Sequence, residues 1–367
     1  MKIIHIVEDF SFKSGGVRTV VKALNDNLLS KGFDSLILSE SKEKEDAILL
    51  INGKDSIWRY SKDWKNKLSK THSQKKIDCI HIHGVWMYPQ YIAAVFAIRN
   101  KIPFIVSPHG MFEPWLWKKG GLKKKAYFNF LIKNKFKKAT VLHAITNQEK
   151  ENLETLFNQN NCVEIPNLIN EKLVNSKNDK KPLFKEKYIL FVGRLDPIKG
   201  LDLLIKAFAK IENEEVSLKI AGGFNSYKKE LETIIRQEGI DSKRIEFLGF
   251  VKEKETLIKN AFIVVAPSYS EVVGMVNLEA AIHKTPVITT HQTGLNKLWD
   301  KNGGFLINPD VKELTSSLNK VLKWPHEERN LAGEKLCHFV SQNYTWKSRI
   351  KDWINLYNNI LDGKNSN

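Results

Sequence analysis

The sequence predicts an α/β protein with two domains, each built on a parallel sheet, and three observations lead to this fold class. Short apolar runs alternate with amphipathic segments along the whole chain, which is typical of parallel strands covered by helices on both faces. With 367 residues, the chain is longer than one hydrophobic core usually sustains. A polar, lysine-rich stretch with a proline, residues 171–187, is the expected interdomain linker.

The composition argues against a membrane-spanning or disulfide-bonded protein. The longest purely apolar run, residues 92–98, is far too short to cross a bilayer, and a strand is expected directly after Met1, without a signal peptide. Cys79, Cys162 and Cys337 are widely separated and lack the spacing of zinc or redox sites. We therefore expect a protein of the reducing cytoplasm.

The first domain is expected to begin with a strand over residues 2–7 and a helix over about 17–31. Gly15 and Gly16 lie at the turn between them, where the backbone could let a phosphate or an acceptor approach the helix N-terminus. Most Gly-Gly pairs are simply turns. The pattern is also not Gly-x-Gly-x-x-Gly, so it gives little support to a nicotinamide dinucleotide.

Two further strands of this domain lead to histidines. In the strand at residues 79–83, His81 and His83 share a face and could bind a metal, but no third ligand lies nearby in the sequence, so a core or cleft role is favoured. The strand at residues 103–106 ends shortly before His109. Catalytic residues of open α/β sheets gather beyond the carboxyl ends of strands, which makes His109 a candidate. The alternative is a histidine that holds its loop together.

The chain has a net charge of +17, with most of the excess in its N-terminal half, so an anionic partner is expected. Residues 115–138 contain nine lysines, no acidic residue and several aromatic residues. A helix there would place lysines on one side and apolar groups on the other, as in an interfacial membrane helix. Two alternatives are a helix packed on the sheet with a solvated basic face, and a nucleic-acid-binding patch. The membrane-facing candidates are Trp115, Trp117, Lys118, Lys119, Lys123, Lys124 and Lys125.

Strands over residues 140–146 and 163–167, with a helix over 148–157 between them, complete the first domain. The second domain is expected to begin at residue 188. Its predicted strands are residues 188–192, 217–221, 244–248, 262–266, 286–289 and 304–307.

The loop after the first strand of the second domain carries two cations. Arg194 and Lys199 precede an amphipathic helix, residues 201–211. Their plain interpretation is solvated loop charge. Together they could instead clamp a diphosphate, with Arg194 as the forked donor and Lys199 as the point charge.

A second strand–loop–helix segment, residues 267–281, carries two carboxylates. Glu271 precedes a helix predicted over residues 275–283, Glu279 lies about a turn inside it, and Gly274 lets the backbone approach a ligand. The N–H groups at the helix start favour an anion. Carboxylates that accept bonds from sugar hydroxyls thus flank a phosphate-binding backbone, which suits a nucleotide sugar. Two glutamates at this spacing alone are usually a helix cap and a surface residue.

The two motifs together resemble the retaining glycosyltransferases of family 4, whose marks are a Glu-x7-Glu motif and a Gly-Arg…Lys-Gly loop. The resemblance covers nearly the whole chain. It implies the GT-B fold, with two Rossmann-like domains whose parallel sheets face each other across a cleft. Residues 1–175 would bind the acceptor, residues 188–345 the nucleotide sugar, and residues 346–367 would form a helix that returns to the N-terminal domain.

The resemblance also implies roles for the candidate residues. Arg194 and Lys199 would stabilise the charge of the departing diphosphate, which requires no metal. Glu271 would hold the sugar and Glu279 the ribose hydroxyls, while His109 would lie against the donor sugar. The remaining donor-binding candidates are Gly15 and Gly16 beside the phosphates, Phe250 and Val251 at the base, and Gly274, Met275 and Val276 at the sugar or phosphate.

The reaction expected from the resemblance is transfer of a hexose from a UDP-, GDP- or ADP-sugar, with retained configuration and no cofactor or metal. The absence of any Asp-x-Asp triplet agrees with metal independence. The expected acceptor is a lipid-linked glycan for O-antigen, capsule or exopolysaccharide, used at the inner face of a bacterial membrane. The alternatives are a soluble acceptor, as in a disaccharide or starch-type synthase, and a basic nucleic-acid-binding protein.

The chain departs from the family pattern at two places. Val272 and Val273 stand where Gly-Phe is common, which would reshape the sugar pocket. Residues 292–297 stand where the family has a Gly-Gly-x-x-Glu turn, and here they contain one glycine and end in a lysine.

Overall fold

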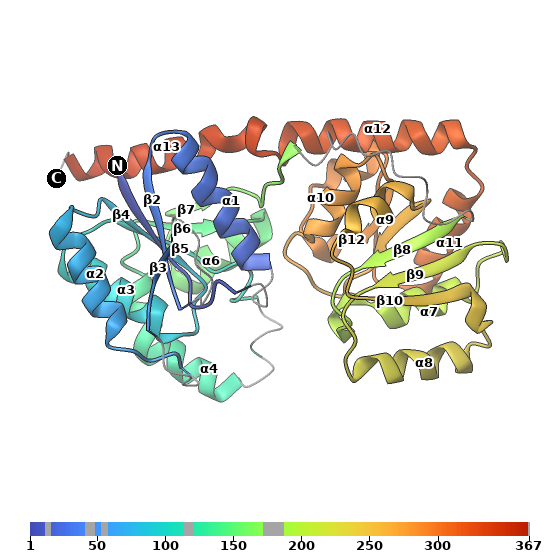
Figure 1. Cartoon of the computed structure of the whole chain (residues 1–367), viewed down its shortest axis with the longest axis horizontal. Coiled ribbons are helices and arrows are strands. Elements are labelled where there is room, and N and C mark those ends of the chain that lie inside the picture. Colours follow the sequence, from blue (N-terminus) through green and yellow to red (C-terminus); the bar gives the residue numbers. More distant parts are fainter. Residues whose placement is uncertain are drawn as a thin grey trace. The chain divides into compact units, whose positions relative to one another are not determined.

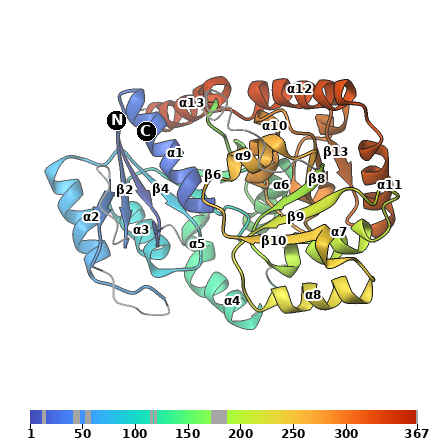
Figure 2. The same ribbon diagram turned by 45° about the vertical axis from the view of Figure 1, so that its right-hand side comes forward.

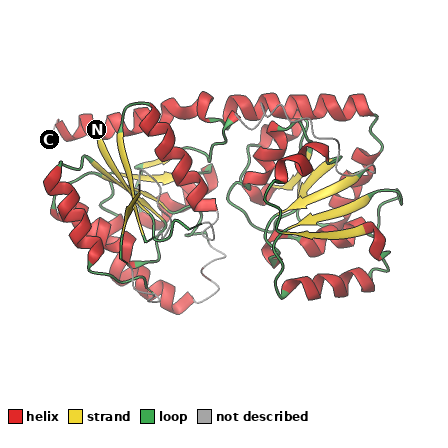
Figure 3. Cartoon of the chain, in the orientation of Figure 1, coloured by secondary structure: helices red, strands yellow, loops and turns green. Residues whose placement is uncertain are grey.

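The computed structural model describes residues 1–11, 16–40, 48–52, 58–113, 117, 121–171 and 187–365. The chain divides into two compact units, one formed by Met1–Asn167 with Ile350–Asn367 and the other by Leu168–Arg349. Each unit is a parallel β-sheet with helices packed against it (Figure 1, Figure 3). The predicted α/β class with two Rossmann-like domains is therefore confirmed. Most of the linker expected at residues 171–187 lies outside the described residues.

The sheet of the first unit has seven strands in the order β3-β2-β1-β4-β5-β6-β7, all parallel. The strands are β1 Lys2–Ile6, β2 Asp34–Ser39, β3 Ile48–Leu50, β4 Cys79–His83, β5 Phe104–Ser107, β6 Val141–Ala144 and β7 Cys162–Glu164. The helices are α1 Gly16–Ser30, α2 Asp63–Gln74, α3 Tyr88–Arg99, α4 Gly121–Tyr127, a π-helix Phe128–Ile132, α5 Lys133–Phe136 and α6 Asn147–Phe157.

The two faces of this sheet differ in chemistry because successive side chains of a strand point to opposite faces. One face is apolar: Ile4 and Ile6 of β1 and Ile80 and Ile82 of β4 belong to the main core cluster, together with side chains of α2, α3, α5 and α6. The alternate positions of the same strands carry the buried histidines His5, His81 and His83.

The sheet of the second unit has six strands in the order β10-β9-β8-β11-β12-β13. Figure 2 labels β8, β9, β10 and β13 of this sheet. One core cluster contains side chains of α7, α8 and α11, and another contains side chains of α9, α10 and α12. The strands are β8 Tyr188–Val192, β9 Ser217–Ala221, β10 Ile245–Gly249, β11 Ile263–Ala266, β12 Val287–Thr290 and β13 Phe305–Ile307. The helices are α7 Leu201–Phe208, α8 Tyr227–Gln237, α9 Lys254–Asn260, α10 Met275–Ile282, α11 Val311–Leu322 and α12 His326–Asn343.

The last helix, α13 Trp346–Asn365, belongs to the first unit from Ile350 onward. Trp353 and Tyr357 are buried there, and the Tyr357 hydroxyl lies 2.7 Å from Nδ1 of His81 on β4. The histidine-bearing face of the first sheet is therefore in contact with α13.

Several boundaries differ from those expected. The helix expected over residues 201–211 ends at Phe208, and the lysine-rich segment forms three short helical pieces, with a π-helix between α4 and α5. The strands β2 and β3 were not predicted. β3 has only three residues and lies at the edge of the sheet, so it leaves a weak signal in the sequence.

Candidate active site

The loops that carry the two motifs of the second unit are joined by backbone contacts. Gly200 has φ +67°, and a Cβ at this position would lie 2.1 Å from the carbonyl oxygen of Pro267, so only glycine fits this approach. The backbone N–H of Tyr269 donates to the Ile198 carbonyl at 2.9 Å. The loop after β8 is thereby fixed against the loop after β11.

This contact brings together Lys199 and Glu271, which are far apart in the sequence. The Lys199 ammonium donates to Oε2 of Glu271, and both side chains are about four-fifths buried, with 20% and 23% of their surface exposed. A small pocket beside them is also lined by Gly274, Val276 and Asn277. A cation, a carboxylate and the start of α10 therefore meet at one place.

The start of α10 is arranged to receive an anion. Its N-cap is Gly274, which has no side chain to bond the first N–H groups of the helix. These N–H groups include those of Met275 and Val276, and an unsatisfied helix N-terminus attracts negative charge. The geometry of this helix start thus agrees with the anion site expected from the sequence.

Glu279, the second carboxylate of the motif, has a lysine partner of its own. The Lys254 ammonium lies 2.6 Å from Oε2 of Glu279. Lys254 is the first residue of α9, and sequence reasoning did not identify it. The feature of the sequence that could have pointed to Lys254 is a lysine at the start of a helix, shortly after the loop that follows β10. Each glutamate of the Glu-x7-Glu motif is therefore paired with one lysine.

Arg194 is not part of these pairs. Its side chain is 80% exposed, and its guanidinium lies 4.0 Å from Asp196, whose carboxylate caps the 3-10 helix Pro197–Lys199. The arginine projects from the same loop that carries Lys199. It can therefore move toward a ligand without breaking a buried contact.

Phe250 and Val251 follow the carboxyl end of β10. The Phe250 side chain is 83% exposed and Val251 is half-buried. Phe224, which follows β9 and is 60% exposed, lies beside Gly249, where a Cβ would be 3.4 Å from its ring. The structure thus places a second exposed ring near the expected base site. Sequence reasoning missed it.

The departure from the family pattern at residues 272–273 has a backbone consequence. Val273 is buried with φ +52°, a conformation that β-branched residues rarely adopt. Its N–H donates to the Thr293 carbonyl at 2.9 Å, and the Glu271 N–H donates to the Gln292 carbonyl at 3.1 Å. The two departing segments are therefore hydrogen-bonded to each other, and they position Glu271 together.

His109 lies in the first unit, at the end of β5. It is half-buried, has φ +54°, and its Nε2 lies 3.0 Å from Nδ1 of His83. The next N–H, that of Gly110, donates to the buried Glu149 carboxylate at 2.6 Å. The other Glu149 oxygen accepts from the Ile145 N–H at 2.9 Å. The loop of His109 is thus held both at a ring nitrogen and at the backbone.

The remaining glycine candidates are only partly described. Gly16 is exposed at the first position of α1. A Cβ added to this glycine would have no other atom within 4 Å. Gly15 lies outside the described residues.

A third histidine, His5 from the adjacent strand β1, joins His81 and His83, and their nitrogens lie within 4.8 Å of one another. The spacing in the sequence could not show this cluster, because His5 comes close to His81 and His83 only through the pairing of β1 with β4. The ring nitrogens are already hydrogen-bonded, however: His5 to His83 at 3.0 Å, and His81 to Tyr357 at 2.7 Å and to Ser107 at 2.6 Å. Burial lowers the pKa of His5 to about 3. The three rings are therefore buried and neutral, and their nitrogens are occupied by hydrogen bonds within the first unit.

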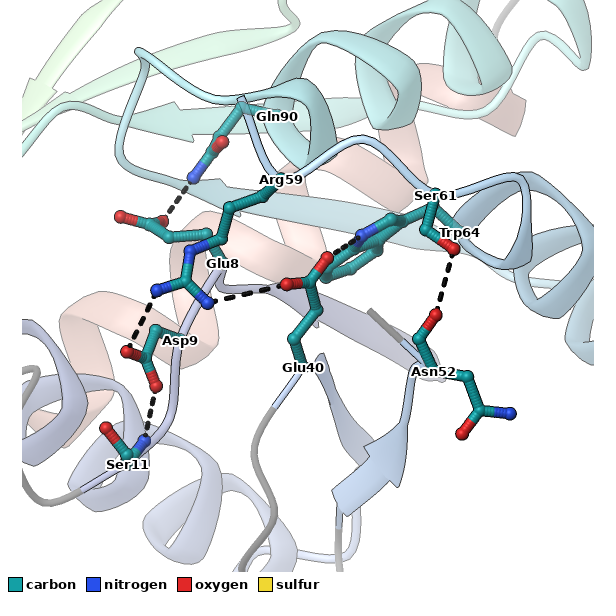
Figure 4. A network of polar contacts seen from close by, with 9 residues as sticks. All are labelled: Glu8, Asp9, Ser11, Glu40, Asn52, Arg59, Ser61, Trp64 and Gln90. Carbon is teal, nitrogen blue, oxygen red and sulfur yellow. Dashed lines mark hydrogen bonds and ion pairs between the residues drawn. The ribbon is translucent and has the colours of Figure 1, made fainter. Parts of the chain in front are cut away.

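A polar network at the carboxyl end of β1 was also missed by sequence reasoning (Figure 4). Arg59 lies 3.2 Å from Asp9 and 3.4 Å from Glu40, and Glu8 accepts a hydrogen bond from Gln90 at 2.5 Å. Burial raises the pKa of Glu8. Gln90 also donates to the His83 carbonyl at 2.9 Å, which ties this network to the strand that supports His109.

The lysine-rich segment divides its apolar residues between core and surface. Phe128, Ile132 and Phe136 are buried, whereas Leu122 is 88% exposed and Phe130 is 83% exposed. Lys123 and Lys125 are exposed, and Lys124 lies 5.6 Å from the Trp86 ring. Trp117 is half-buried, and its Nε1–H donates to the Phe112 carbonyl at 3.0 Å, so it packs on the core instead of standing free. Trp115, Lys118 and Lys119 lie outside the described residues.

Comparison with known families identifies the chain. Residues 14–173 match the family described as Glycosyltransferase Family 4, and residues 174–335 match Glycosyl transferases group 1. An uncharacterised glycosyltransferase from Methanocaldococcus jannaschii is 30% identical over 78% of this chain and 76% of its own length. The chain belongs to the group 1, family 4 glycosyltransferases.

Two further comparisons cover almost the full length of this glycosyltransferase. An uncharacterised 41.2 kDa protein in the cps region of Klebsiella pneumoniae is 26% identical over 97% of this chain and 99% of its own length. The crystal structure of HepE from Anabaena, in complex with UDP and glucose, superposes with a TM-score of 0.71 at 16% identity, over 100% of this chain and 98% of HepE. The GT-B fold expected from the sequence is thus confirmed. Among the described residues, no helix combines the length and apolarity that a bilayer crossing needs.

Proposed function

We propose that this glycosyltransferase moves a hexose from a nucleoside diphosphate sugar to a lipid-linked glycan of a bacterial surface polysaccharide, with retained configuration. The observation that carries the proposal is the meeting of Lys199, Glu271 and the uncapped start of α10 in one pocket. This arrangement offers a cation and backbone N–H groups to phosphate beside a carboxylate for sugar hydroxyls. A free sugar would not need the cation, and a free nucleotide would not need the carboxylate.

In the proposed donor complex, Lys199 and Arg194 hold the diphosphate. Lys199 exchanges its contact with Glu271 for a phosphate oxygen, which releases the carboxylate for the sugar. Glu279 holds the ribose hydroxyls, the N–H groups of Met275 and Val276 face sugar or phosphate, and Phe250 and Val251 hold the base. The UDP and glucose found in HepE support a nucleotide-sugar donor of this kind.

The chemistry proposed for the site is departure of the diphosphate as the bond to the anomeric carbon breaks. Arg194, Lys199 and the N–H groups of α10 stabilise the charge that develops on the leaving group. His109 contacts the donor sugar. The cations and helix N-terminus supply the charge that a divalent metal would otherwise provide, so we propose a reaction without a cofactor or metal.

The acceptor is proposed to lie at the inner face of the cell membrane, to which the enzyme binds peripherally. Leu122 and Phe130 are exposed apolar groups on a segment with many lysines, which is the chemistry of an interfacial surface. The relative from a cps region supports a role in surface polysaccharide. A soluble acceptor is the alternative, because Phe128, Ile132 and Phe136 of the same segment pack into the core as they would in a protein without a membrane role.

Liposome flotation tests the membrane part of the proposal. We expect Lys123, Lys124 and Lys125 replaced together by Gln to abolish flotation with anionic liposomes while turnover on a water-soluble acceptor analogue is largely kept. Binding of the unaltered enzyme should weaken with added salt, because exposed charges are screened beyond roughly 8 Å at physiological ionic strength. The control replaces Lys229, Lys243 and Lys312 of the second unit, all exposed, and removes the same charge. Equal flotation of both variants would retire the membrane role.

A further inference from the structure

We propose that four buried residues, Asn25, Ser35, His5 and His83, hold His109 as the tautomer that carries its proton on Nε2 and presents Nδ1 as a hydrogen-bond acceptor. These four are positioning residues, because they act on the donor sugar only through His109. The consequence for donor binding rests on the proposed function. The tautomer itself follows from the hydrogen bonds of the first unit.

The chain of hydrogen bonds crosses three adjacent strands. Ser35 on β2 donates from Oγ to Oδ1 of Asn25 on α1 at 2.7 Å, and Nε2 of His5 on β1 lies 3.1 Å from the same Oγ. Nδ1 of His5 lies 3.0 Å from Nε2 of His83 on β4. Nδ1 of His83 lies 3.0 Å from Nε2 of His109. All members except His109 are buried.

The protons in this chain can be assigned in order. The Asn25 amide faces Ser35 with its oxygen, which can only accept. A hydroxyl has one hydrogen, so with this orientation Ser35 gives its hydrogen to Asn25 and accepts from Nε2–H of His5. A neutral imidazole carries one proton, so Nδ1 of His5 is an acceptor and Nε2 of His83 must donate to it. The same step repeats at His83, whose Nδ1 accepts from Nε2–H of His109. Nδ1 of His109 is therefore left without a proton.

This assignment requires that the imidazole rings are neutral, and burial keeps them neutral by lowering their pKa values. Burial lowers the pKa of His5 to about 3, and burial together with the neighbouring histidines lowers the pKa of His83 well below its ordinary value. Burial also lowers the pKa of His109. At neutral pH each ring thus has one donor and one acceptor nitrogen.

A second chain on the same face of the sheet is directed by a backbone carbonyl, which can only accept. Nε2 of His143 lies 2.8 Å from the Ile165 carbonyl oxygen, so it carries the proton, and Nδ1 of His143 accepts from Ser107 Oγ at 2.7 Å. Ser107 then accepts from Nε2–H of His81 at 2.6 Å, and Nδ1 of His81 accepts from the Tyr357 hydroxyl at 2.7 Å. All nitrogens of His81 and His143 are thus used, so neither ring competes for His109.

A fixed acceptor at Nδ1 of His109 has a consequence for donor choice. The sugar must offer a hydroxyl hydrogen to this nitrogen, and a donor that lacks the hydroxyl leaves a half-buried acceptor unpaired, which is costly. The backbone clamp from Glu149 to Gly110 keeps the ring in place. The five-residue chain therefore selects donors with a free hydroxyl facing His109.

Nitrogen-15 NMR of the full-length enzyme with labelled histidine tests the tautomer without requiring turnover. Ring nitrogens that carry a proton resonate far from those that do not, and His109→Gln assigns the His109 signals. We expect a bare Nδ1 and a protonated Nε2 at His109. A protonated Nδ1 would mean that the chain runs in the opposite direction and would overturn the proposal. Failure of the donor assay alone would contradict the proposed function and leave the tautomer standing.

Ser35→Ala tests whether the chain causes the tautomer. Without the serine, His5 can take either proton position, so we expect mixed tautomers at His109 and a loss of kcat of about fivefold, the effect of one misdirected neutral hydrogen bond. Ser35→Thr keeps the hydroxyl and should restore a single tautomer. The matched control is Ser39→Ala, a buried serine on the same strand that is not in the chain. An unchanged His109 signal in Ser35→Ala would overturn the proposal.

Discussion

Lys199 and Lys254 each form an ion pair with one glutamate of the Glu-x7-Glu motif, so both carboxylates have a fixed partner. Glu271 and Glu279 are held in place by ammonium groups and are not freely solvated. An ion pair between partly exposed groups contributes little to stability, typically 0–1 kcal/mol, so its value here lies in positioning. Sequence reasoning identified three of these four residues from their position after strands. It missed Lys254, because a single lysine at a helix start has no distinctive spacing.

Lys199→Ala and Arg194→Ala are each expected to slow transfer by about 10²- to 10³-fold, the usual effect of losing one preorganised donor to a developing charge. Steady-state kinetics with a verified donor measures this. The fold should survive, because Arg194 lies on a loop and Lys199 ends a short 3-10 helix, both outside the strands and α-helices. Lys210→Ala, an exposed position past the end of α7, is the control. Near-normal turnover in both loop variants would refute the diphosphate clamp.

Glu149 gives the structure a specific pH dependence. Burial raises its pKa from the ordinary 4.5 to about 7. The unfolded chain therefore loses this proton first as pH rises, and the contribution of Glu149 to the free energy of unfolding is full below about pH 4.5 and declines as pH rises to about 7. The total change is about 3 kcal/mol.

Denaturant unfolding at a series of pH values measures this effect. The difference in unfolding free energy between the unaltered enzyme and Glu149→Gln should shrink between about pH 5 and 7, since glutamine does not titrate. Glu151→Gln, at an exposed position of the same helix, is the control. A difference that stays constant across this range would show that Glu149 titrates normally.

At the scale of elements, the strands were predicted well where they are buried on both faces. The expected strands at residues 188–192 and 217–221 match β8 and β9, because buried parallel strands are almost continuous apolar runs. The unpredicted β2 has polar residues at both ends, and β3 is a three-residue edge strand. For the lysine-rich segment the sequence indicated a helix, and the structure divides it into α4, a π-helix and α5. Sequence periodicity could not show the π-helix Phe128–Ile132, because Phe128 and Ile132 would share a face of an ordinary α-helix as well.

The junction of the two motif loops depends on Gly200, and a pair of glycines isolates this effect. Gly200 and Gly239 both have φ +67°, but a Cβ at Gly200 would lie 2.1 Å from the Pro267 carbonyl oxygen, whereas nothing lies within 4 Å at Gly239. Gly239→Ala should therefore lower the free energy of unfolding only by the strain of a left-handed alanine, roughly 1–2 kcal/mol. Alanine at Gly200 should cost a further 1–3 kcal/mol for the clash and should also slow transfer.

Thermal or denaturant unfolding of the two variants checks this prediction, with transfer rates measured below the unfolding transition. Equal stability loss in Gly200→Ala and Gly239→Ala would mean that the loops tolerate separation. Normal transfer by a destabilised Gly200→Ala variant would mean that the loop contact does not position Lys199.

At the scale of the whole molecule, the sequence supported two Rossmann-like units because the alternation of strands and helices runs through the chain. It could not show which strands are neighbours. The order β2-β1-β4 brings Ser35, His5 and His83 together, although they lie far apart along the chain. Only the fold, therefore, shows that the histidines form connected hydrogen-bond chains. The polar network of Arg59 with Asp9 and Glu40 was hidden for the same reason.

The central claim, metal-free retaining transfer from a nucleoside diphosphate sugar, is tested most directly by one donor assay. UDP-, GDP- and ADP-sugars are supplied in excess EDTA, and proton NMR records the anomeric configuration of the first product. We expect one nucleotide class to be consumed despite EDTA, with the configuration of the donor retained and with Lys199→Ala slower by about 10²- to 10³-fold. Consumption that EDTA abolishes and Mn²⁺ restores, or a product of inverted configuration, would contradict the account.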